Sequence, residues 1–154
     1  MASRDRINVD VEVKSNADKM WESLKDSAVL FPKALPDLYK SIQVLEGDGK
    51  SVGSVHFKNF RGLPLTTVLK EKIDSIDEDN KTLCYSIIEV EESSYYKNFK
   101  AQVKVVEKGE GSLVKWECEF EKASEVAADH HPALYYKDFA VKNFKQLDDY
   151  LLKA

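Results

Sequence analysis

Hydrophobic and polar residues alternate along much of the chain, and a period of two is typical of strands with one buried face. The clearest run covers residues 7–13, Ile-Asn-Val-Asp-Val-Glu-Val. Six further segments are predicted to be strands: 42–46, 55–60, 66–76, 83–91, 99–106 and 113–120. Polar and glycine-containing clusters at 77–80 and 109–111 separate two pairs of them and predict hairpin turns.

Between the first two strands the spacing becomes helical. Asn16 precedes a segment in which Trp21 and Leu24 lie three residues apart, and we expect its side chain to cap a helix. Pro32 and Pro36 follow, and we expect these prolines to break the chain into short helices, because proline lacks the N–H that a helix interior needs.

A long helix is predicted at the C-terminal end, opened by His131-Pro132, because proline is favoured in a first helical turn. One stripe recurs there at intervals of three and four: Tyr136, Phe139, Ala140, Asn143, Leu147 and Leu151. The predicted order is a strand, two short helices, six strands and a long helix. An α+β fold with a strongly curved antiparallel sheet around that helix satisfies it, and such a sheet encloses more space than one helix fills. The length predicts a single domain over 1–154.

Charge and composition argue against several classes of function. The 154 residues carry a formal net charge of −4, whereas a nucleic-acid binder needs a basic surface. No apolar run approaches the roughly 20 residues of a membrane-spanning helix, and residues 1–6 lack the apolar segment of a secretory signal. We therefore expect a cytoplasmic protein without nucleic-acid or membrane partners. Cys84 and Cys118 are expected to be free thiols.

Three of the six glycines, Gly47, Gly49 and Gly53, lie within seven positions. With Lys50-Ser51 among them, the stretch is similar to a phosphate-binding loop. Such a loop leads from a strand into a helix, whereas strands are predicted here on both sides. We therefore interpret 46–54 as a turn between strands in which glycine supplies positive φ angles. This segment is called the glycine loop below.

Several short motifs are spread over almost the whole chain. They are Leu30-Phe31-Pro32-Lys33, Tyr39-Lys40-Ser41-Ile42, Leu45-Glu46-Gly47-Asp48-Gly49, Val52-Gly53-Ser54, Lys70-Glu71-Lys72-Ile73-Asp74, Tyr95-Tyr96-Lys97-Asn98-Phe99-Lys100, Gly111-Ser112-Leu113-Val114-Lys115-Trp116, Phe120-Glu121-Lys122-Ala123 and Asp149-Tyr150-Leu151-Leu152. Together they resemble the Bet v I-type superfamily of plants, and more closely its major latex protein-like branch.

The resemblance implies a helix-grip fold: a seven-stranded sheet that grips the C-terminal helix, with two short helices and a large internal hydrophobic cavity. Members of the superfamily bind hydrophobic small molecules such as hormones, flavonoids and sterols, and several have become enzymes of specialised metabolism. One position departs from the family pattern. The fifth strand usually ends in Ile-Glu-Gly, but this chain has Val90 in place of the glycine. Because residues 89–95 form the cavity rim in the family, a ligand is not carried over from relatives.

The third strand has two possible phases. Apolar periodicity favours Val55 and Phe57 on the inside, whereas the family register, counted from the glycine loop, turns His56, Lys58 and Phe60 inward. We favour the second, because a slip of one residue would flip the whole strand and the glycine loop fixes the register. An inward Lys58 loses basicity by desolvation and becomes a base or imine-forming group, and His56 can shuttle protons. The alternative is that Lys58 extends to the rim or that the strand has the opposite phase.

Alternation and the family register together give a set of candidate site residues. The candidate catalytic residues are Lys58, His56 and Tyr85. The residues expected to bind a ligand are Leu24, Phe31, Leu35, Phe60, Leu69, Glu71, Leu83, Ile87, Phe99, Ala101, Val103, Trp116, Tyr136, Phe139, Ala140 and Asn143. Asn143 is the most informative of them, because a buried amide requires a partner or a ligand.

Two other chemistries are weighed against simpler interpretations. Asp129-His130-His131 suggests a metal site, but adjacent histidines do not share a helix face and a polar turn before the helix explains them as well. Ribonuclease activity is reported for some relatives, and its residues would correspond to His56, Tyr95, Asp148 and Tyr150. Two of these types differ from the expected ones and the chain is acidic, which disfavours that activity. We therefore expect no metal and no cofactor.

The leading hypothesis is a monomer that binds a small hydrophobic plant metabolite in an internal cavity, with a role in specialised metabolism or defence. The second hypothesis is an enzyme in which the same cavity orients a reactive intermediate and relays protons for cyclisation or isomerisation.

Overall fold

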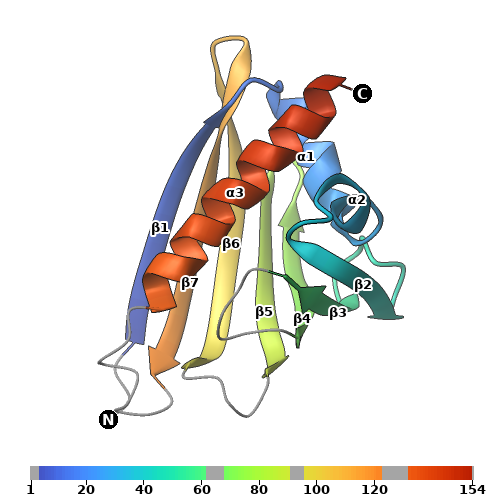
Figure 1. Ribbon diagram of the computed structural model, residues 1–154, viewed down its shortest axis with the longest axis vertical. Coiled ribbons are helices and arrows are strands. Elements are labelled where there is room, and N and C mark those ends of the chain that lie inside the picture. The colour runs from blue at the N-terminus through green and yellow to red at the C-terminus, as the bar shows by residue number, and fades with distance from the viewer. Residues whose placement is uncertain (1–3, 62–67, 91–95, 123–131, 154) are drawn as a thin grey trace.

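Seven antiparallel strands form one sheet that curves around a long C-terminal helix (Figure 1). This computed structural model describes residues 4–61, 68–90, 96–122 and 132–153. The elements are β1 (Arg4–Val13), α1 (Ala17–Lys25), α2 (Ser27–Ala34), β2 (Tyr39–Glu46), β3 (Val55–Phe60), β4 (Val68–Asp77), β5 (Thr82–Val90), β6 (Tyr96–Lys108), β7 (Gly111–Lys122) and α3 (Pro132–Lys153). The strand order is β1-β7-β6-β5-β4-β3-β2, so β1 and β2 are the edges. The predicted α+β architecture is confirmed.

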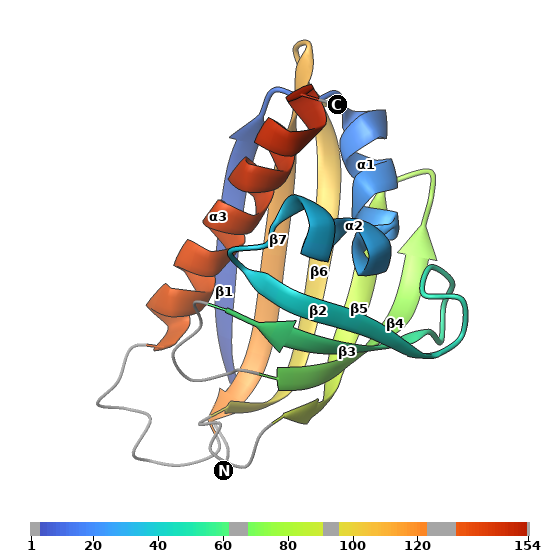
Figure 2. The same ribbon diagram turned by 45° about the vertical axis from the view of Figure 1, so that its right-hand side comes forward.

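The alternating segment that opens the chain forms β1, and its apolar residues face the core. Val9 and Val11 are buried, while the intervening Asp10 is exposed. Across the antiparallel ladder they face Trp116 and Val114 of β7. The helix α3 crosses the concave side of this part of the sheet (Figure 2). Sequence periodicity thus fixes which face of β1 is covered.

The two short helices are divided before the first proline and not at it. Asn16 caps α1 as expected, with its Oδ1 accepting from the N–H of Lys19 at 2.8 Å. The break comes at Asp26, whose backbone (φ −97°, ψ 21°) leaves the helical region. Pro32 lies inside α2, so the prediction that it separates the helices was wrong. Pro32 removes only one intrahelical hydrogen bond from this helix of eight residues, and α2 forms despite that loss.

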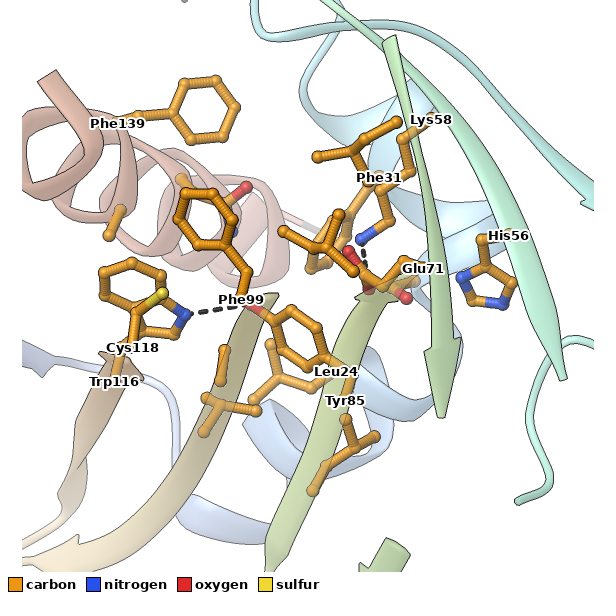
Figure 3. A pocket seen from close by; sticks show the side chains of 18 of the residues that line it. Leu24, Phe31, His56, Lys58, Glu71, Tyr85, Phe99, Trp116, Cys118 and Phe139 are labelled. Carbon is orange, nitrogen blue, oxygen red and sulfur yellow. Dashed lines mark hydrogen bonds and ion pairs between the residues drawn. The ribbon is translucent and has the colours of Figure 1, made fainter. Parts of the chain in front are cut away.

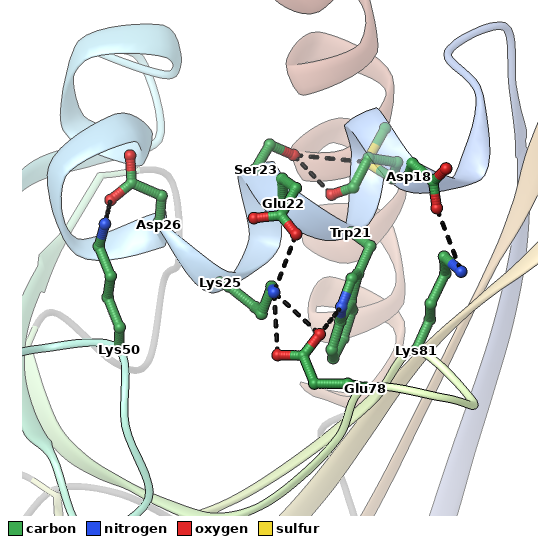
Figure 4. Close-up of polar contacts among 10 residues, drawn as sticks. Asp18, Trp21, Glu22, Ser23, Lys25, Asp26, Lys50, Glu78 and Lys81 are labelled. Atoms are coloured by element: carbon green, nitrogen blue, oxygen red, sulfur yellow. Dashed lines mark hydrogen bonds and ion pairs between the residues drawn. The ribbon is translucent and has the colours of Figure 1, made fainter.

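The first helix is attached to the turn between β4 and β5 (Figure 4). Glu78 of that turn accepts a hydrogen bond from Nε1 of Trp21 at 2.8 Å and one from Nζ of Lys25 at 2.9 Å. Lys50 of the glycine loop reaches Asp26 at 3.3 Å. The turn is a hairpin, as predicted, and the carboxylate of Glu78 also attaches α1 to it.

The glycine loop joins β2 to β3, so the prediction that it connects two strands is confirmed. Gly47 has a φ of 78°, and a Cβ there would lie 2.6 Å from Oγ of Ser54. The end of the loop pairs with β4: Gly53 donates to the carbonyl of Ile73 at 2.8 Å, and Ile73 donates back to Ser54 at 3.0 Å. These two hydrogen bonds set the phase of β3.

The C-terminal half of α3 packs closely against β1. Leu147 is completely buried, and Leu151 is buried beside it. Asp148 accepts from the backbone N–H groups of Lys14 and Ser15, at 2.9 and 2.8 Å, and so joins α3 to the chain just after β1. None of the described helices combines the length and hydropathy needed to cross a bilayer.

Candidate functional site

A pocket of about 150 Å³ lies between the concave face of the sheet, the short helices and the N-terminal half of α3 (Figure 3). Its aromatic wall consists of Phe31, Phe60, Phe99, Tyr136 and Phe139. Phe60 and Phe139 meet edge to face with 5.4 Å between ring centroids, and Phe99 and Tyr136 do so at 5.6 Å. Such walls favour an apolar occupant with a flat face.

The third strand adopts the register counted from the glycine loop. His56, Lys58 and Phe60 line the pocket, whereas Val55 and Phe57 do not appear among its lining residues. Apolar alternation alone would have given the opposite phase. The backbone pairing of the glycine loop with β4 fixes the other phase. A shift of one residue in this pairing would turn every side chain of β3 to the opposite face.

Lys58 forms a buried ion pair with Glu71 of β4. Its Nζ lies 2.9 Å from Oε1 of Glu71, and the two side chains are 9% and 10% exposed. The same Nζ stands 5.8 Å from the centroid of the Tyr85 ring. Lys58 therefore turns inward and does not extend to the rim. Burying such a charge pair costs desolvation free energy, and apolar residues of similar volume would often stabilise the fold as well.

His56 lies beside this pair on the same strand and is 2% exposed. Its Nε2 is 2.8 Å from the carbonyl oxygen of Gly49. A carbonyl only accepts, so Nε2 carries the proton. Burial lowers the pKa of His56, and the charge of Lys58 lowers it further, so the ring is neutral at pH 7. Its Nδ1 is buried and has no hydrogen-bond partner among the described residues.

Two hydrogen bonds connect the other polar groups of the pocket. The hydroxyl of Tyr39 donates to Oδ1 of Asn143 at 2.6 Å, which provides the partner that the buried amide requires. Nε1 of Trp116 donates to the hydroxyl of Tyr85 at 2.9 Å. Burial, followed by the nearby charge of Glu71, raises the pKa of both tyrosines, so their hydroxyls stay protonated.

Cys118 contributes a thiol to the pocket wall. Burial raises its pKa to about 12, and the charge of Glu119 adds to the effect. A thiol that stays protonated at neutral pH is a poor nucleophile. Cys118 therefore acts as a small hydrophobic residue, and the other cysteine, Cys84, is free as well.

Comparison with known proteins gives the family. The model of the pathogenesis-related protein Bet v 1 family matches residues 2–154. The chain is 49% identical over 148 residues to MLP-like protein 423 of Arabidopsis thaliana, covering 96% of this chain and 94% of that protein. The chain belongs to the Bet v 1 family. Within it, this relative supports the major latex protein-like branch, and proteins of the family bind small hydrophobic ligands.

Solved structures show the same Bet v 1 fold. Ginseng major latex-like protein 151 from Panax ginseng superposes with a TM-score of 0.86 at 26% identity, covering 97% of this chain and 98% of that one. Norcoclaurine synthase from Thalictrum flavum superposes with a TM-score of 0.79 at 21% identity, covering 99% and 97%. At that identity the second likeness concerns the fold alone. Family membership supports a ligand-binding or metabolite-related role.

The predicted site residues line the Bet v 1 pocket with one exception. The residues found there are His56, Lys58, Tyr85, Leu24, Phe31, Phe60, Leu69, Glu71, Leu83, Ile87, Phe99, Ala101, Val103, Trp116, Tyr136, Phe139, Ala140 and Asn143. Leu35 is fully buried but is not among the lining residues, so its part in ligand binding stays a prediction. It follows the last residue of α2, where its side chain packs into the core.

Other lining residues were missed by the sequence prediction: Lys25, Ser27, Tyr39, Ile73, Val90, Cys118 and Phe144. Cys118 shares the alternating face of Trp116, and Phe144 lies four residues after Ala140. Strand alternation and helical spacing could therefore have predicted both as lining residues. Val90 was singled out as a departure at the rim, and it borders the pocket directly. Residues 91–95 of that rim lie outside the described residues.

Neither alternative chemistry has an assembled site among the residues that the structure describes. Residues 129–131, the suggested metal site, lie outside the described residues, and the described part of the chain contains no group of three potential metal ligands. Of the residues considered for ribonuclease activity, Tyr95 also lies outside. Asp148 is engaged by the backbone of Lys14 and Ser15, away from the pocket that His56 lines.

Proposed function

We propose that this Bet v 1 family protein binds a small hydrophobic plant metabolite in the pocket between the sheet and α3. The observation that carries the proposal is an open space with apolar and aromatic walls in a region where a helix and a sheet would otherwise pack closely. Apolar surface removed from water provides about 25 cal/mol per Å², which is sufficient to hold a small apolar molecule.

Orientation of the ligand would come from the few polar groups on the walls. The ion pair of Lys58 and Glu71 and the imidazole of His56 stand on neighbouring strands, and Asn143 stands on α3. A small number of fixed polar groups in an apolar pocket is the usual source of ligand specificity. These groups lie on strands and a helix and so are held in place by the fold.

Native mass spectrometry after exposure to a plant metabolite extract tests the proposal. We expect the protein to retain one or more small molecules, and an Ala140→Phe variant, which fills the pocket from α3, to retain none. Val141→Phe adds the same ring one position along, at an exposed site outside the pocket, and this variant should retain them. Capture that survives Ala140→Phe, or no capture by the native protein, would contradict the proposal.

A second candidate is an enzyme that uses the same pocket for cyclisation or isomerisation of a reactive intermediate. It is favoured by the buried pair of Lys58 and Glu71 beside a neutral imidazole, since these are a proton donor, a carboxylate and a base in a low-dielectric space. Incubation with the same extract, followed by mass spectrometry of the small molecules, should then show products. If Lys58→Ala and His56→Ala proteins that remain folded form the same products, catalysis by these residues is excluded.

The cytoplasmic location, the monomeric state and a role in defence or specialised metabolism stay predictions.

A further inference from the structure

The imidazole of His56 is held in one orientation by two features. It is 2% exposed on β3, and its Nε2 donates to the carbonyl of Gly49 at 2.8 Å. Gly49 lies in the glycine loop with a φ of 85°, and a Cβ at that position would lie 2.9 Å from Cγ2 of Val44 and 3.8 Å from Nε2 of His56. The loop therefore approaches the ring closely on the side of Nε2. It fixes the tautomer and directs the other nitrogen away from the loop.

Nδ1 of His56 consequently points inward with its lone pair unused. In Figure 3 one ring nitrogen of His56 is directed toward Glu71 and the other away from it, and the hydrogen bond to Gly49 identifies the second as Nε2. No hydrogen-bond donor among the described residues reaches Nδ1. Lys58, two residues along β3, directs its ammonium to Glu71. A buried acceptor without a partner costs free energy, so an occupant that donates a hydrogen bond there recovers it.

We propose that His56 Nδ1 is the specificity-determining acceptor of the pocket, and that it selects ligands whose apolar body carries a hydroxyl group directed at β3. This inference rests on the proposed function and specifies the ligand class for the same site. The hydroxyl would donate to Nδ1 while the rest of the molecule lies against the aromatic wall. A ligand of the same shape without the hydroxyl would bury Nδ1 unpaired. A site built to hydrogen-bond a ligand group discriminates strongly against analogues that lack it.

The electrostatic surroundings agree with a neutral donor and acceptor pair. Lys58 and Glu71 compensate each other's charge, so they do not call for an ion. Tyr39 and Tyr85 are protonated, and their hydroxyls already interact with Asn143 and Trp116. Burial lowers the pKa of His56, which keeps its Nδ1 lone pair available at neutral pH.

Fluorescence titrations with 2-naphthol and 2-methylnaphthalene test the inference on the full chain, since the two probes differ by a hydroxyl in place of a methyl group. The ratio of their affinities is measured for the native protein, for His56→Leu and for the control Phe57→Leu, which changes a residue outside the pocket. Comparing ratios between proteins cancels the difference in hydration of the probes. We expect His56→Leu to lower the naphthol preference about tenfold and Phe57→Leu to leave it unchanged.

A second measurement avoids the variants, because His56→Leu also leaves the carbonyl of Gly49 without its donor and can impair folding. Long-range proton–nitrogen NMR spectra of the native protein resolve both ring nitrogens. Saturation with 2-naphthol should shift Nδ1 strongly and Nε2 weakly, and 2-methylnaphthalene should shift neither strongly.

An unchanged affinity ratio in His56→Leu, or an unmoved Nδ1 resonance in the presence of bound 2-naphthol, would overturn the inference while leaving the proposed function intact. If neither probe binds the native protein and no metabolite is retained from the extract, the proposed function fails and the inference fails with it.

Discussion

The two halves of α3 continue one stripe of side chains but meet very different surroundings. Toward the C-terminus, Leu147 and Leu151 are buried against the core, and Asp148 is hydrogen-bonded to the chain after β1. Toward the N-terminus, Phe139 and Asn143 border a pocket that also contains a buried ion pair. We call these regions the packed half and the open half. One amphipathic helix thus packs closely against the core with one end and borders the pocket with the other.

Truncation in the packed half should have the largest effect on stability. Leu147→Ala removes a fully buried side chain from close-packed surroundings and should lower the free energy of unfolding by about 3–5 kcal/mol. Phe139→Ala in the open half enlarges a space that already exists, so its cost should be less than half as large. Urea denaturation of both variants measures this. Equal losses would remove the distinction between the two halves.

Breaking the buried ion pair should have the next largest effect. Lys58→Met leaves the carboxylate of Glu71 buried without its partner. Loss of one partner costs about 3–5 kcal/mol in a close-packed interior, and we expect about 2–3 kcal/mol here because the pair borders a pocket. The double variant Lys58→Met with Glu71→Leu should recover most of that loss. If the double variant is as unstable as the single one, the ion pair itself contributes net stability. That result would contradict the proposal that Lys58 and Glu71 serve ligand binding.

Removing the Tyr39 hydroxyl tests the connection between the open half and the edge of the sheet. Tyr39→Phe leaves the buried amide oxygen of Asn143 without its donor at 2.6 Å. We expect a loss of about 1–2 kcal/mol by thermal or urea denaturation. The control is Tyr135→Phe, at an exposed position of α3, the helix that carries Asn143. It should change the free energy of unfolding by less than about 0.5 kcal/mol. Equal effects of the two substitutions would mean that the hydrogen bond is unimportant.

The smallest expected effect is a pH dependence from His56. Its pKa is lowered in the folded protein by burial and by Lys58, so below the ordinary value of about 6.5 the unfolded chain binds more protons than the folded one. Stability should therefore fall as the pH drops through 6.5 toward the lowered pKa, by no more than about 0.8 kcal/mol between pH 7.5 and 6. In His56→Gln this component should vanish, whereas His130 and His131 remain in both proteins. An identical pH profile for the two proteins would contradict the neutral, buried imidazole.

The sequence predicted the order of elements because strand alternation, the Asn16 cap and the stripe of α3 are local signals. The phase of β3 needed more, since Val55 and Phe57 fit a buried face as well as His56 and Lys58 do. Backbone pairing of the glycine loop decided it. The family register turned Lys58 inward, but its ion pair could not be predicted from a local pattern, because Glu71 is thirteen residues away on the next strand.

What the sequence could not supply depends on the orientation of whole elements. Leu35 and Tyr39 lie four residues apart after α2, yet Leu35 enters the core and Tyr39 faces the pocket. Lys25 and Ser27 line the pocket on either side of the helix break at Asp26, which no proline marks. Which of these side chains line the pocket depends on how α1 and α2 pack onto the sheet. Local sequence patterns do not predict that packing.

The position of a bound apolar probe shows whether the pocket between the sheet and α3 holds a ligand. Nuclear Overhauser effects from 2-naphthol to protein methyl groups should appear at Ala101 of β6 and Ala140 of α3, which line the pocket on the sheet and helix sides. Val29 and Val52 are exposed apolar residues outside the pocket and should show none. Contacts to Val29 and Val52, with none to Ala101 and Ala140, would place binding on the surface and contradict the account.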